Sequence, residues 1–89
     1  MSAPRVRLQS SVRVRLGPER GFLFDERSGR VYSLNATGAV AAAALRDDKP
    51  EREIVDSVVE SFAVEAATAR RDLERFIEHL VREGLATRG

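Results

Sequence analysis

The chain has 89 residues, of which 43% are hydrophobic and 33% are charged, values typical of one soluble globular domain. It contains no cysteine and a single histidine, His79, which excludes a disulfide framework, a thiol nucleophile and a multi-histidine metal centre. The net charge is +1, but seven arginines and three acids fall in residues 1–30, whereas residues 31–89 carry eight basic and eleven acidic residues. With no apolar run of about 18 residues and no signal peptide, we expect a cytoplasmic protein without a membrane span.

The first eleven residues show no firm hydrophobic periodicity. We therefore predict a flexible arm over 1–11 and a single domain over 12–86. In Val12–Leu16 polar and apolar residues alternate, which predicts a half-buried strand. The side chains expected to face inward are those of Val12, Val14 and Leu16.

Two more strands follow. Phe22–Phe24 is apolar on both faces, which is typical of a central strand. The turn residues Ser28 and Gly29 precede Arg30–Leu34, where polar and apolar residues alternate again. We predict a three-stranded antiparallel meander in which the first and third strands form the edges.

The second half of the chain has helical periodicity. Asn35 occupies an N-cap position before a helix predicted over 36–45, and Pro50 fits the first turn of a second helix. A third helix is predicted over 66–83, ended by Gly84. Three strands followed by three helices indicate an α+β fold, because a parallel sheet would need strands and helices to alternate.

No catalytic constellation is present. His79 has Glu78 and Glu83 near it in sequence, but Glu78 points elsewhere on a regular helix, and a lone histidine is usually structural. The other acids of the third predicted helix stand beside arginines at spacings that stabilise helices by a few tenths of a kcal/mol. We predict no enzyme activity, no metal and no cofactor.

The third predicted strand offers a binding surface instead. A sheet edge carries unpaired N–H and C=O groups, and an apolar helix beside it would complete a groove for an extended peptide. Tyr32 and Leu34 share one face of this strand, and we expect them in the core. Val31 and Ser33 are then the residues that face elsewhere.

Two segments carry a family resemblance. Residues 29–38 contain the pattern Gly, x, x, Tyr, x, Leu-Asn, and residues 71–85 contain Asp, apolar, x, x, Phe, apolar, x, x, Leu, ending in Gly-Leu. Together these segments resemble the PqqD family, and the resemblance extends over about residues 10–86. One departure is Asp47-Asp48, where many relatives have glycine. The resemblance implies a winged-helix-like fold and a non-catalytic recognition element for ribosomally synthesised, post-translationally modified peptides (RiPPs).

The resemblance also implies a site. In relatives the leader segment of a precursor peptide adds as a fourth strand on the third strand and packs against the third helix. Carried over to this chain, the implied peptide-binding residues are Arg30, Val31, Tyr32, Ser33, Asp72, Arg75, Phe76 and His79. Asp72 matches the family aspartate, although a pair with Arg75 or a local cap would explain it equally well.

The partner implied by the resemblance is a separate enzyme. It is either a radical S-adenosylmethionine maturase, as in pyrroloquinoline quinone synthesis, or a leader peptidase, as in lasso-peptide assembly. The turn Asp25 to Arg30 is similar to that of the lasso-peptide recognition proteins.

Two other functions remain open at this point. A winged-helix protein can bind DNA, but Glu74, Glu78 and Glu83 in the third predicted helix do not favour nucleic acid as a partner. The chain could also be an assembly subunit that dimerises by pairing two edge strands. For the free protein we expect a monomer or a weak dimer.

Overall fold

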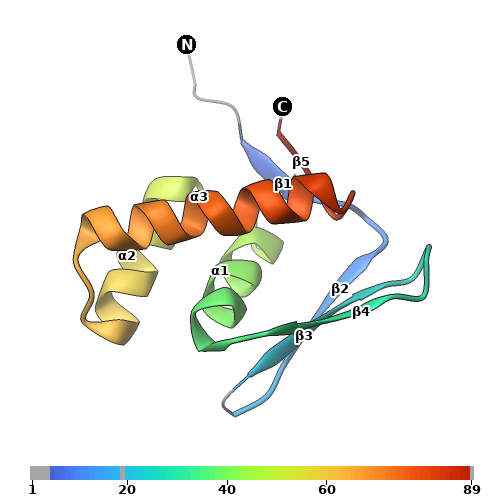
Figure 1. Cartoon of the computed structure of the whole chain (residues 1–89), viewed down its shortest axis with the longest axis horizontal. Coiled ribbons are helices and arrows are strands. Elements are labelled where there is room, and N and C mark those ends of the chain that lie inside the picture. The colour runs from blue at the N-terminus through green and yellow to red at the C-terminus, as the bar shows by residue number, and fades with distance from the viewer. Residues whose placement is uncertain (1–4, 19, 89) are drawn as a thin grey trace.

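The computed structural model describes residues 5–18 and 20–88. In these residues it has an α+β fold with a three-stranded antiparallel sheet and three helices, as predicted, and α1 packs on the sheet (Figure 1). The elements in chain order are β1 (Val6–Leu8), β2 (Val12–Leu16), β3 (Gly21–Asp25), β4 (Val31–Leu34), α1 (Ala36–Arg46), α2 (Glu51–Phe62), α3 (Ala66–Arg82) and β5 (Ala86–Arg88).

The main sheet has the predicted order β2-β3-β4, with β3 in the centre. Leu23 of β3 pairs with Val14 on one side and Tyr32 on the other, and its side chain is fully buried under the helices. One expectation for this sheet is wrong. Leu16 is 51% exposed instead of buried, because it ends β2 above a shallow hollow that the small side chains of α1 leave unfilled.

Helix α1 is the centre of the domain and contacts β1, β2, β3, β4 and both other helices. It begins as predicted, with Asn35 as the N-cap: the amide of Gly38 donates a hydrogen bond to Asn35 Oδ1 at 2.8 Å. Its buried face is made mainly of alanine, which lets the surrounding elements approach closely.

Helices α2 and α3 bury one apolar stripe each. In α3 the stripe consists of Ala69, Leu73, Ile77 and Leu80. Gly84 then takes φ +76°, a conformation that favours glycine, and turns the chain back. The amide of Leu85 donates a hydrogen bond to the carbonyl of Leu80 at 2.8 Å, and Leu85 is fully buried.

The predicted flexible arm is wrong for the part of residues 1–11 that the structure describes. β1 pairs antiparallel with β5, Val6 is buried, and the amide of Gln9 donates to the carbonyl of Leu85 at 2.8 Å. A strand of three residues is too short to show a period, and its partner lies at the other end of the chain. Residues 1–4 lie outside the described part.

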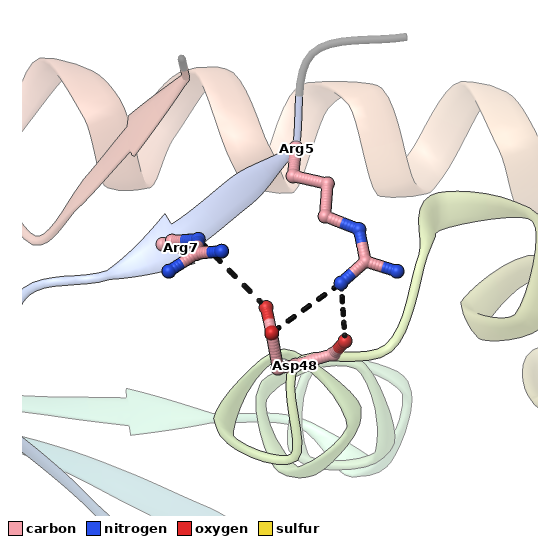
Figure 2. Close-up of polar contacts among 3 residues, drawn as sticks. All are labelled: Arg5, Arg7 and Asp48. Carbon is pink, nitrogen blue, oxygen red and sulfur yellow. Dashed lines mark hydrogen bonds and ion pairs between the residues drawn. The ribbon is translucent and has the colours of Figure 1, made fainter. Parts of the chain in front are cut away.

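Polar contacts of Asp48 fix the start of β1 to the turn between α1 and α2 (Figure 2). Arg5 Nη1 lies 3.3 Å from both the backbone oxygen and the carboxylate of Asp48, and Arg7 Nε lies 4.0 Å from the same carboxylate. Asp48 has φ +57°, in the left-handed region. Glycine adopts this conformation without strain, so the position that Asp48 occupies is one that favours glycine.

Within the described residues, no helix combines the length and apolarity needed to cross a bilayer. The same residues hold no cluster of histidine and acidic side chains that could bind a metal ion.

Candidate functional site

The outer edge of β4 has no partner strand among the described residues. The amide of Asp25 donates to the carbonyl of Arg30 at 2.9 Å, which makes this a hydrogen-bonded pair at the end of the β3–β4 ladder. Such pairs alternate along an antiparallel ladder, so Tyr32 and Leu34 also direct their backbone groups toward β3. The N–H and C=O groups of Val31 and Ser33 therefore point outward, away from the sheet.

The side chains of β4 alternate in the predicted manner. Leu34 is buried and Tyr32 is half-buried on the side of the helices, whereas Val31 and Ser33 are exposed on the opposite face. Val31 is 62% exposed, the largest fraction among the exposed large apolar side chains of the described residues. This strand therefore combines free backbone groups with an apolar inner face.

A groove of about 430 Å³ lies between β4 and α3. We call it the edge groove. Val31, Tyr32 and Ser33 line it from the strand, and Phe76, His79 and Leu80 line it from the helix. The groove exists because α3 packs against α2 and β5, which holds the helix away from the sheet edge. Its shape suits an extended chain laid along the strand.

A second hollow, of about 330 Å³, continues from the edge groove toward the start of α1. We call it the Asp72 pocket. Its lining includes the small residues Gly38, Ala41 and Ala69, of which both alanines are buried, and the exposed Asp72. Phe76 lines both hollows, as do Asn35 and Gly38, so the two form one continuous depression.

The structure brings most of the predicted site residues together. Five of them, Val31, Tyr32, Ser33, Phe76 and His79, line the edge groove, and Asp72 and Phe76 line the pocket beyond it. Arg30 and Arg75 line neither hollow and are exposed. The pKa of Arg30 is raised, mainly by the side chain of Tyr32 and then by the charge of Glu83.

Asp25 shapes the turn that presents β4. Its carboxylate accepts hydrogen bonds from the hydroxyls of Ser11 and Ser28, both at 2.9 Å, and from the amide of Arg27 at 3.1 Å. Gly29 then takes φ +77° and donates its amide to the carbonyl of Asp25 at 2.8 Å. The turn fixes the register in which Val31 reaches the edge.

Sequence reasoning did not assign Asn35 and Gly38 to the site, although they line both hollows. A signal for Gly38 existed, because glycine inside a helix costs about 1 kcal/mol relative to alanine and needs a reason. A Cβ at this position would lie 3.1 Å from Asn35 Oδ1 and would crowd the cap.

One protein family and two solved structures resemble this chain. A family model described as coenzyme PQQ synthesis protein D (PqqD) matches residues 20–86. Among curated proteins, none has a matching sequence.

Two solved structures share the fold. TbiB1 in complex with the TbiA(beta) leader peptide superposes with a TM-score of 0.81 at 25% identity, covering 90% of this chain and 93% of that one. A lasso peptide synthetase B1 complexed with its leader peptide gives a TM-score of 0.79 at 26% identity, covering 93% of this chain and 98% of that one. The family match, the shared fold and the open edge of β4 agree with one another, and the chain belongs to the PqqD family.

Proposed function

We propose that this protein binds the leader segment of a ribosomally synthesised precursor peptide as an added strand on β4. The observation that carries the proposal is the unpaired edge at Val31 and Ser33, which faces the groove formed with α3. Backbone hydrogen bonds would supply affinity, and every second peptide side chain would enter the groove. The two leader-peptide complexes with the same fold support this role.

The protein acts in this proposal as a non-catalytic adaptor. It presents the rest of the precursor to a separate enzyme, in the cytoplasm, where ribosomes release the precursor. The likeness to lasso peptide B1 proteins favours a leader peptidase over a radical S-adenosylmethionine maturase as that enzyme. The DNA-binding alternative gains no support, since Glu74 and Glu78 are exposed on α3 among its arginines.

Substituting Val31 by proline tests strand addition. Val31→Pro removes an outward N–H and leaves the β3–β4 ladder intact, because Val31 belongs to a pair that is not hydrogen-bonded. We expect the affinity for a peptide, selected on the wild-type protein from a random display library, to fall at least about tenfold in fluorescence anisotropy.

Val31→Ala is the matched control, because it keeps the amide and removes only an exposed side chain. It should bind nearly as the wild type does, and circular dichroism should show both variants folded. If Val31→Pro destabilises the domain, a peptide N-methylated at alternate residues makes the same test on the ligand. Equal affinity of folded Val31→Pro and Val31→Ala would contradict strand addition.

A further inference from the structure

No side-chain hydrogen bond among the described residues involves the carboxylate of Asp72, which is exposed. None of the ion pairs among the described residues includes it, so the pair with Arg75 that the sequence allowed is not formed. Asp72 also lies inside α3, whose N-cap is Glu65, and so it is not a cap. This exposed acid is one of the residues that line the pocket, and its carboxylate is available to an incoming group of opposite charge.

The pocket beside Asp72 has the form that a long basic side chain needs. Ala41, Ala69 and the ring of Phe76 offer an apolar path along which methylene groups can pack. Asp72 then meets the charged end, and a cation near Phe76 gains further attraction from the ring. Arg71 and Arg75, the nearest cations along α3, line neither hollow. Neither arginine would therefore compete with the basic end group of a peptide for the carboxylate of Asp72.

We propose that Asp72 makes this protein select leader peptides with a lysine or arginine, which occupies the Asp72 pocket. The inference rests on the proposed strand addition, since the strand must bring the side chain there. The Asp72 pocket continues from the edge groove past Phe76, and side chains on one face of a strand recur every second residue. The basic residue therefore lies an even number of residues from an apolar side chain that fills the edge groove.

Parallel selections from a random-peptide display library test the proposal. The library is selected on wild-type protein, on Asp72→Lys and on Glu74→Lys. Glu74 is the matched control, because it is an exposed acid two residues further along α3 and lines neither hollow. The wild type and Glu74→Lys should both enrich peptides with an apolar residue and a basic residue at even spacing. Asp72→Lys should keep the apolar preference and lose the basic one.

Affinities measured on one selected peptide complete the test. Asp72→Lys should weaken binding of the lysine-containing peptide roughly three- to tenfold, and should leave its lysine-to-norleucine analogue unchanged. The difference between the two peptides should shrink in high salt. A basic preference that persists in Asp72→Lys, or an apolar preference alone on the wild type, would overturn the role of Asp72. Peptides that bind Val31→Pro as well as they bind the wild type would instead overturn strand addition.

Discussion

Asp25 is the buried acid of the described core, with 4% of its surface exposed. The pKa of its carboxyl lies below the ordinary value of 3.8, first because of the hydrogen bond from Ser28, then those from Ser11 and the amide of Arg27. Burial acts in the opposite direction but does not outweigh these bonds. The ionised form therefore favours the folded state, in which it holds the turn before β4.

This lowered pKa predicts a pH dependence of stability. The folded carboxyl binds protons more weakly than the unfolded one, so its contribution is fully present above the unfolded pKa. It is lost as the pH falls through the lowered folded pKa. We expect the urea midpoint of the wild type to fall more steeply than that of Asp25→Asn between about pH 5 and pH 2. The exposed neighbour Glu26→Gln is the control, and parallel curves for wild type and Asp25→Asn would contradict the prediction.

Among the strands, β1 and β4 contribute differently: β1 holds the fold together, and β4 leaves a sheet edge open. β1 is paired with β5 and buries Val6, so it closes the fold by joining the two ends of the chain. β4 lies in the other sheet and keeps an edge without a partner strand among the described residues. In the proposed function, stability and peptide binding therefore depend on different strands.

This separation predicts the effect of truncating a side chain in β1. Val6→Ala should lower the free energy of unfolding by about 2 kcal/mol, because it removes two buried methyl groups and leaves a cavity. Arg7→Ala changes an exposed neighbour and should cost less than about 0.5 kcal/mol. Urea denaturation measures both. Equal losses of unfolding free energy in the two variants would contradict this division between β1 and β4. A loss of peptide affinity in folded Val6→Ala would contradict it as well.

The whole molecule is small and flat, with extents of 37 × 35 × 19 Å. A domain of this length buries only about two thirds of the surface that its unfolded chain exposes, so its stability margin is narrow. A peptide that completes the sheet would cover apolar surface in the edge groove. Peptide binding would then stabilise the folded state, because the unfolded chain has no sheet edge to which the peptide can bind.

We therefore expect the melting temperature to rise with the concentration of a peptide selected on the protein. At a free peptide concentration of 100 times Kd, the gain in unfolding free energy should be about 2.7 kcal/mol. Scanning calorimetry measures the shift, and Val31→Pro should show none. Light scattering should give one peptide per monomer. A protein dimer in the complex, or a melting temperature that does not depend on peptide concentration, would contradict the addition of a single peptide strand to the vacant edge of β4.

The local pattern of the sequence determined much of this protein. Alternation in Val12–Leu16, the double-faced Phe22–Phe24 and the N-cap Asn35 each depend on neighbours a few residues away, and the elements they predicted are present. The edge position of β4 followed from the same reasoning. Helical spacing likewise placed Asp72, Phe76 and His79 on one element, although it could not say what they face.

Only the tertiary structure decided the rest. The pairing of β1 with β5 joins residues at opposite ends of the chain, and three-residue strands carry no period that would reveal it. Whether Leu16 is covered depends on the size of side chains across from it in α1. The edge groove and the Asp72 pocket exist because packing holds α3 away from β4, and a distance between elements is a property of the packed core that no local pattern encodes.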